Sequence, residues 1–229
     1  MFGYLDKYGS SVETVDFLNS VIDYLYNKPT YDFGGDIEMV PQGSFDFDQA
    51  YASEPANEYK LDQSTQQAYP RFTKLVNQLS AYLKANPSVI KAIEYYTGYT
   101  RGQIIQLATP GYGPSIKVTY DDMSYSDGTQ DYGYYRRYDN NGNKASVLYI
   151  NEAFVKGLES ANLQSTQQAT AFLLAVTIFH ESVHYGRNMN DTTPYADFEY
   201  GVGFERLAFH IIVDKDNAGN ITKYRFILK

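Results

Sequence analysis

Two of the three histidines in this chain lie four residues apart, and a glutamate directly follows the first of them. The segment is FHESVHYG, in which His180, Glu181 and His184 form the pattern H-E-x-x-H. Residues four apart on an α-helix differ by about 40° of rotation, so both imidazoles can bind one metal ion. Glu181 would lie about 60° from His184, close enough to reach a metal-bound water without being a ligand. The ion would lower the pKa of that water and polarise a carbonyl, while the glutamate would transfer the proton.

The two alternatives to a metal site are chance and histidines that serve only packing. If the three histidines and the glutamates of this chain were placed at random, H-E-x-x-H would occur in roughly a few chains per thousand. A purely packing role leaves unexplained why two polar rings and a carboxylate follow the apolar run FLLAVTIF. The sequence therefore predicts a metal site. Because the chain has no cysteine, histidine and carboxylate must hold the ion, and we expect Zn²⁺.

A catalytic zinc site needs a third protein ligand and one open position. The metzincin pattern H-E-x-x-H-x-x-G-x-x-H would supply a third histidine, but this chain has Arg187 and Asn190 at the positions of its glycine and last histidine. That class is excluded. The remaining histidine, His210, lies 26 positions after His184. A carboxylate in the segment FEYGVGFERLAF is the better candidate.

The segment EYGVGFE resembles the second motif of thermolysin-like gluzincins, E-x-G-x-x-x-E, at Glu199, Gly201 and Glu205. In that motif the last glutamate is the ligand, so the resemblance implies that Glu205 binds the ion. Glu199 is the main alternative; Asp191 and Asp197 are lesser ones, because aspzincins use an aspartate soon after H-E-x-x-H. Six positions apart on a helix, the two glutamates would point about 120° from each other, so both could not easily bind one ion.

The group that stabilises the developing oxyanion is the least defined part of the predicted site. Gluzincins use a histidine or tyrosine well downstream of the ligand glutamate, and only 24 residues follow Glu205. His210 would lie about 140° around a continuing helix, so it reaches the site only if the helix ends first. We expect His210 in this role. The alternatives, each of which could instead serve packing, are Tyr185, Tyr195, Tyr200 and Tyr224.

Apolar spacing and turn residues indicate the elements that position these side chains. The first part of the chain combines one short amphipathic helix with a long stretch that has no periodicity. Helices that precede the motif are predicted over 11–26, 64–86 and 87–96, with Gly98 as a stop signal, and in a short segment that begins near Thr100. The aperiodic stretch covers residues 27–60.

The second part of the chain alternates strands with helices. Strands are predicted over 116–120 and 145–151, separated by the turn signal DNNGN. Helices follow over 152–161 and from near Ser165, where STQQ is a capping signal, to Gly186. The chain then forms a short helix within GFERLAFHII and a hairpin around DNAGN.

The composition of the chain limits the kinds of partner that it can bind. With 229 residues, 43% of them hydrophobic, the chain is long enough for one domain with a buried core. Its formal charge of −8 is scattered along the sequence, which argues against a nucleic acid partner. We find no classical signal peptide and no run of 18 apolar residues, and therefore expect no membrane span.

Four segments together resemble the metallopeptidase domains at the C-termini of bacterial polymorphic toxins and related secreted effectors. They are NPSVIKAIEYYTGYTRGQIIQLATPGYGPSIKV, VLYINEAFVKGLE, AVTIFHESVHYG and EYGVGFE, within roughly residues 62–213. The resemblance implies an α+β, zincin-like fold in which a small mixed sheet packs against the long H-E-x-x-H helix, with additional helices before it. It also implies that SVLYIN is the sheet edge beside that helix, where an extended substrate would pair.

The same resemblance implies a domain division and a biological setting. Residues 1–61 would be an irregular segment with a short helix, acting as a linker, a wrap or an inhibitory segment, and residues 62–229 would form the metallopeptidase domain. The family implies a protein or peptide substrate, and secretion or delivery to a target cell. A cognate immunity or inhibitor protein would be a further partner.

Two functions are consistent with these features. The first is zinc-dependent hydrolysis of peptide or amide bonds, with His180, His184 and Glu205 as ligands and Glu181 as general base and acid. The alternative is a binding or adhesion module whose ligand face is the Tyr-rich segment YDDMSYSDGTQDYGYYRRYD, with a structural or vestigial metal site. We favour the first, because a structural zinc site has no use for an unligated glutamate beside the ion.

Overall fold

The computed structural model describes residues 61–109, 111–120, 123, 131–191 and 199–221. The helix expected over 11–26, the stretch 27–60, and Tyr195, Asp197 and Tyr224 lie outside these residues. The division at residue 61 therefore stays a prediction. The elements are α3 (Gln63–Ala68), α4 (Pro70–Ala85), α5 (Pro87–Thr97), α6 (Arg101–Leu107), β1 (Ser115–Thr119), β2 (Gly133–Tyr135), β3 (Val147–Asn151), α7 (Glu152–Ser160), α8 (Gln164–Met189) and α9 (Tyr200–Phe209).

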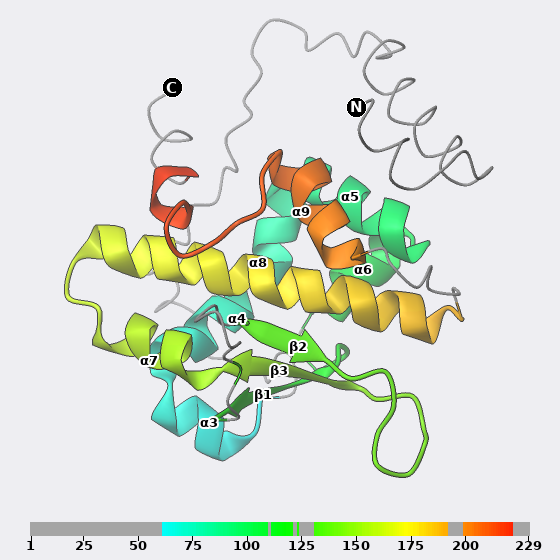
Figure 1. Ribbon diagram of the computed structural model, residues 1–229, viewed down its shortest axis with the longest axis horizontal. Helices are drawn as coiled ribbons and strands as arrows, with labels where there is room; N and C mark the ends of the chain where they lie inside the picture. Colours follow the sequence, from blue (N-terminus) through cyan, green and yellow to red (C-terminus); the bar gives the residue numbers. More distant parts are fainter. Residues whose placement is uncertain (1–60, 110, 121–122, 124–130, 192–198, 222–229) are drawn as a thin grey trace, which may run out of the picture. The chain divides into compact units, whose positions relative to one another are not determined.

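The fold is α+β, with a small mixed sheet against one long helix, as the sequence predicts. The strands are ordered β1-β3-β2, with β1 parallel and β2 antiparallel to β3. Figure 1 shows α8 running between this sheet on one side and α5 and α9 on the other, and α8 contacts all of these helices together with β2 and β3. The long helix is therefore the central layer of the domain.

The middle of α8 is buried on every side. All residues from Ala171 to Phe179 are buried, and Leu174 and Ile178 are fully so. The hydroxyls of Thr177 and Ser182 donate to the carbonyl oxygens four residues earlier, which satisfies them without solvent. A helix that is apolar all round belongs in a protein core. Among the described residues, no helix is both long and apolar enough to cross a bilayer.

Helix boundaries differ from the predicted ones at two places. The helix predicted over 64–86 is broken at Tyr69, because Pro70 lacks an N–H and disfavours helical geometry in the residue before it. Helix α8 starts one residue before Ser165 without a side-chain cap, and it continues past Gly186 to Met189. Gly186 does not end the helix; its role is packing, since an added Cβ would lie 2.8 Å from side-chain atoms of both Thr97 and Tyr99.

The strand predicted to form the sheet edge beside α8 is instead the central one. The segment SVLYIN forms β3, which pairs on both sides, and the outer strand in contact with α8 is β2, which the sequence did not indicate. At Gly133 the backbone of β2 approaches α8 so closely that an added Cβ would lie 2.9 Å from Cγ2 of Thr177. The prediction that SVLYIN forms the edge strand beside α8 is therefore wrong, and β2 is the outer strand that contacts this helix.

The hairpin predicted around DNAGN is also wrong. The carboxylate of Asp214 accepts hydrogen bonds from the backbone N–H groups of Asp216 and Asn217, both at 2.8 Å, and residues 218–221 are helical. An aspartate in this position caps a helix.

The turn predicted at DNNGN is confirmed: Gly142 has a φ of 79°, and Asp139 accepts from the N–H groups of Asn141 and Asn143. Helix α5 with its left-handed Gly98 cap, α6, α7 and strand β1 are confirmed as well.

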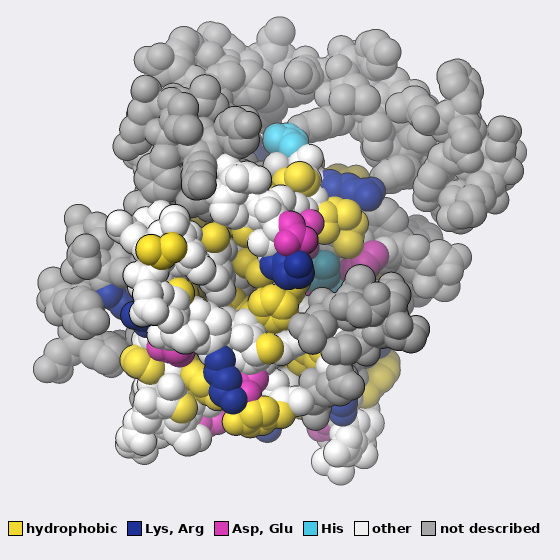
Figure 2. Space-filling view, turned by 60° about the vertical axis from the view of Figure 1, so that its left-hand side comes forward, with side chains coloured by type: hydrophobic (Ala, Val, Ile, Leu, Met, Phe, Trp, Pro, Cys, Tyr) yellow, Lys and Arg dark blue, Asp and Glu magenta, His cyan; other side chains and the backbone are white. Residues whose placement is uncertain are grey.

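The face of the molecule in Figure 2 mixes charges of both signs. Acidic and basic side chains of the described residues lie next to one another and between hydrophobic ones. Among the described residues, the side chains of Lys215 and Asp216 form an ion pair at 3.0 Å. The described part of this face therefore carries no single-sign patch.

Replacing Gly133 by alanine should destabilise the domain, because the added Cβ would also lie 2.7 Å from the carbonyl oxygen of Tyr149 and would force β2 away from α8. We expect a loss of about 1–3 kcal/mol in the free energy of unfolding, measured with urea. Gly157→Ala is the control. Gly157 lies inside α7 with nothing within 4 Å of an added Cβ, so this change should stabilise by about 0.5–1 kcal/mol. Equal effects of the two changes would contradict the close approach of β2 to α8.

Candidate metal centre

The two motif histidines lie on one face of α8, as the helical spacing predicts. Their ring centroids are 5.3 Å apart, and both side chains are partly accessible, at 18% for His180 and 28% for His184. Glu181 is buried, with one carboxylate oxygen 4.0 Å from Nε2 of His180. Two partly accessible imidazoles thus lie beside a carboxylate that is almost fully buried.

Glu199 meets these histidines from the start of α9. It is the N-cap of that helix, where its Oε1 accepts a hydrogen bond from the N–H of Gly201 at 2.9 Å. The same oxygen lies 2.6 Å from Nε2 of His184 and 3.5 Å from Nε2 of His180. The three potential ligand atoms all lie within 4.8 Å of one another.

This donor set fits a metal ion. Bonds of 2.0–2.1 Å in a tetrahedral site place two ligand atoms roughly 3.3 Å apart. The 3.5 Å separation between Glu199 and His180 matches that spacing, while the 2.6 Å separation from His184 would have to open slightly. Two imidazole nitrogens and one carboxylate oxygen also form the donor set that catalytic zinc sites use.

Glu205, the preferred ligand in the sequence analysis, lies on the other side of the His180 ring. Its Oε1 is 2.6 Å from Nδ1 of His180, while its Oε2 accepts a hydrogen bond from the N–H of Val213 at 2.6 Å. Among the described residues, the group that could hold an ion contains Glu199 and does not contain Glu205. The angle of about 120° expected between the two glutamates applies only if both belong to one helix. Glu199 is instead a cap with extended geometry.

Two glycines explain why α9 can come so near. A Cβ on Gly201 would overlap ring atoms of His180, and a Cβ on Gly203 would lie 2.7 Å from the ring of Tyr96. Both glycines have ordinary helical backbone, so what they provide is space rather than unusual torsion angles. The segment EYGVGFE therefore forms the start of a helix that places one carboxylate on each side of the His180 ring.

Burial, hydrogen bonds and neighbouring charges shift the pKa values of the side chains in this cluster. Burial alone would lower the pKa of His180, but hydrogen bonds with Glu199 and Glu205 and the charge of Glu181 raise it to about 10. Burial acts to raise the pKa of Glu199, yet its hydrogen bonds with the two histidines hold it below the usual value. Burial raises the pKa of Glu181, against the opposing charges of the histidines, and the charges of Glu199 and Asp131 add to the increase.

The charge of Asp131 raises the pKa of Glu181, so the residues just before β2 lie near that carboxylate. The sequence did not indicate this proximity. Asp131 belongs to the Tyr/Asp/Gly-rich stretch between the predicted strands, where apolar spacing carries no signal. Only the pairing of β2 with β3, which is not local in sequence, could have placed it there.

Other residues considered for the site have different surroundings. His210 is exposed and forms the left-handed C-cap of α9, with a φ of 63°, so the helix does end before it. Asp191 pairs with Lys144 at 2.5 Å. The ring of Tyr200 lies under the guanidinium of Arg187, 3.5 Å from the ring centroid. Tyr185 packs edge-on against the ring of Tyr135. Neither His210 nor Asp191 belongs to the group of three potential ligands.

Comparison with protein families identifies the chain. Residues 65–210 match the family model described as metallopeptidase toxin 3. The match covers more than half of the chain, so the chain belongs to this family. The metallopeptidase toxin resemblance is therefore confirmed, and the family implies a metal ion and a peptidase activity. No curated protein and no solved structure gives a significant match.

Gly201→Ala should impair metal binding more than Gly203→Ala. Both changes disturb the packing of α9, but only the first displaces the ring of His180. We expect at least a tenfold loss of Zn²⁺ affinity for Gly201→Ala beyond the loss for Gly203→Ala, measured by competition with a chromophoric chelator. Equal losses in the two variants would mean that the approach of α9 to His180 does not shape the site.

Metal uptake should release a proton. His180 has a raised pKa of about 10 and is therefore protonated in the metal-free protein at neutral pH, whereas a ligand imidazole must be neutral. Between pH 7 and pH 9 the apparent Zn²⁺ affinity should rise about tenfold per pH unit. Calorimetry in buffers of different ionisation enthalpy measures the released protons. An affinity that does not change with pH over this range would contradict the charge state derived for His180.

Proposed function

We propose that this domain is a zinc-dependent peptidase with His180, His184 and Glu199 as metal ligands and Glu181 as general base. The observation that carries the proposal is the convergence of three ligand atoms from α8 and α9 beside a buried carboxylate outside the group. Family membership supports the reaction class. The metal assignment rests on the donor set, which contains nitrogen and oxygen but no sulfur.

Glu181 has the properties that a general base requires. Bound Zn²⁺ would supply a Lewis acid for the scissile carbonyl and would lower the pKa of water. Glu181 accepts the proton of the attacking water and donates it to the leaving amine. Because burial raises its pKa, its carboxylate is a stronger base than an exposed glutamate. The group that would stabilise the oxyanion stays a prediction for His210 and the tyrosines.

The substrate is proposed to be an extended protein segment that pairs with β2. This strand is at the end of the strand order and contacts α8, so its outer backbone groups run beside the helix that carries Glu181. Extended peptides add to such an edge through backbone hydrogen bonds. The toxin family further supports delivery to a target cell, and we propose a cognate immunity protein as a partner in the producing cell.

The alternative binding module has less support. In the Tyr-rich segment that would form its ligand face, Tyr135 donates its hydroxyl hydrogen to the carbonyl of Ala145 and accepts from the amide of Asn188. Tyr134 stacks on Tyr149, with ring centroids 4.6 Å apart. Both rings are thus part of the packing between β2 and its neighbours, and no described feature of these side chains indicates a ligand.

Glu181→Gln tests the proposed function. This variant should keep about one zinc per chain and lose peptide cleavage by about 10²–10⁴-fold, because the proton acceptor is gone while the ligands remain. The measurement is cleavage-site profiling on a mixture of unfolded cellular proteins, with metal analysis of the same samples.

Glu94→Gln is the matched control, since Glu94 lies on α5 outside the group of potential ligands and should leave cleavage unchanged. Metal-free protein that cleaves as fast as the zinc-loaded protein would overturn the assignment. So would a Glu181→Gln variant with wild-type activity, which would favour a function that needs no general base.

A further inference from the structure

Glu205 is a buried carboxylate whose two oxygens each face an N–H group. It is 5% exposed, on the inner face of α9. Its Oε1 lies 2.6 Å from Nδ1 of His180, and its Oε2 lies 2.6 Å from the backbone nitrogen of Val213. A carboxylate has no proton to donate, so both neighbours must be donors. Nδ1 of His180 therefore carries a proton.

We infer that Glu205 is not a metal ligand but the positioning residue of the site, which fixes the tautomer and the orientation of His180. This inference rests on the proposed metal centre. With the proton at Nδ1, the lone pair of neutral His180 is at Nε2, the nitrogen that faces Glu199. Ligand histidines commonly donate their second N–H to a carboxylate in this way, which orients the ring and raises its basicity.

The ring of His180 is held from two directions. Glu205 binds the ring at Nδ1, and the backbone of Gly201 lies so close to the ring that a Cβ there would overlap Nε2, Cδ2 and Cε1. Both constraints come from α9, the helix whose N-cap supplies Glu199. One short helix thus provides the proposed third ligand and fixes the angle of the first histidine.

A carboxylate is needed at this position, because an amide could not satisfy both neighbours while the proton of His180 stays at Nδ1. Glutamine has one acceptor oxygen and one NH₂ donor. If its oxygen accepted from Val213, its NH₂ would face the N–H of His180 and favour the tautomer that carries the proton at Nε2. If its oxygen accepted from His180, its NH₂ would face the N–H of Val213. The first arrangement satisfies both neighbours only when the proton of His180 moves to Nε2, which removes the lone pair from the nitrogen that faces Glu199, and the second leaves the N–H of Val213 without an acceptor.

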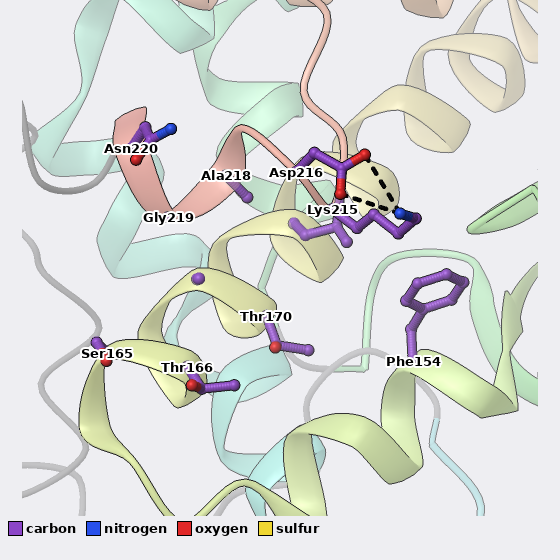
Figure 3. A pocket seen from close by; sticks show the side chains of 11 residues that line it. Phe154, Ser165, Thr166, Thr170, Lys215, Asp216, Ala218, Gly219 and Asn220 are labelled. Atoms are coloured by element: carbon purple, nitrogen blue, oxygen red, sulfur yellow. Dashed lines mark hydrogen bonds and ion pairs between the residues drawn. The ribbon is translucent and has the colours of Figure 1, made fainter.

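The second contact of Glu205 extends this arrangement to a pocket. Val213 is buried, and two residues later the N–H of Lys215 donates to the hydroxyl of Tyr132 at 3.1 Å. Lys215 and Asp216 line a pocket of about 290 Å³ beside α7 and the first turns of α8, which Figure 3 shows. The carboxylate that orients His180 therefore also anchors the segment that forms one wall of this pocket.

The test compares Glu205→Gln with Glu199→Gln in the full chain, with zinc and cobalt as the probes. Glu205→Gln should lower Zn²⁺ affinity by about 10–100-fold, while the visible absorption spectrum of bound Co²⁺ stays that of the wild type, because the ligands are unchanged. Glu199→Gln should alter the Co²⁺ spectrum, because it removes a ligand oxygen. Wild-type affinity in Glu205→Gln would overturn the inference. So would an altered spectrum in Glu205→Gln together with an unaltered one in Glu199→Gln, which would make Glu205 the ligand.

A second measurement uses the unaltered protein and so does not depend on the folding of any variant. In the zinc-loaded wild type, the ¹H–¹⁵N NMR spectrum of the histidine side chains should show a protonated Nδ1 in His180 and a metal-bound Nε2. A metal-bound Nδ1 would overturn the inference. Because neither readout needs a substrate, a protein that binds zinc in this way but cleaves no peptide would refute the proposed peptidase function alone.

Discussion

The close approach of α9 to α8 at Gly201 is the contact on which the arrangement of the site depends. Because no side chain lies between the α9 backbone and the ring of His180, the helix start carries Glu199 to one side of the ring and Glu205 to the other. A β-carbon at that point would separate the helices and move both carboxylates. The absence of one methyl group thus decides whether two histidines from one helix acquire a third partner from another.

The burial of α8 determines how the charges in this centre behave. The helix crosses the core with apolar residues on all sides, and its polar motif begins where solvent first reaches the face. Glu181 stays on the dry side, so its charge is poorly solvated and its pKa rises, while His180 lies between carboxylates and gains a proton. Both pKa values are thus raised, by burial in one group and by neighbouring carboxylates in the other, and clusters of shifted pKa values are typical of functional sites.

Local patterns predicted the local features well. The H-E-x-x-H spacing placed both histidines on one face, and apolar periodicity found α5, α6, α7 and most of α8. The features that local patterns did not predict depend on packing between distant segments. Glu199 and Glu205 could not be ranked from helical angles, because the first is a cap rather than a helical residue. Strand β2 has three residues, too few for a period, and only its pairing with β3 reveals that SVLYIN is not an edge.

The hydrogen bond from Val213 to Glu205 joins residues only eight positions apart, across the left-handed turn at His210. Closing so short a loop costs less conformational entropy than pairing strands that are remote in the chain. The support for His180 can therefore form early, as one compact helix-and-turn unit, before the sheet is complete. The contacts that hold the ring of His180 therefore involve no residue of the sheet edge.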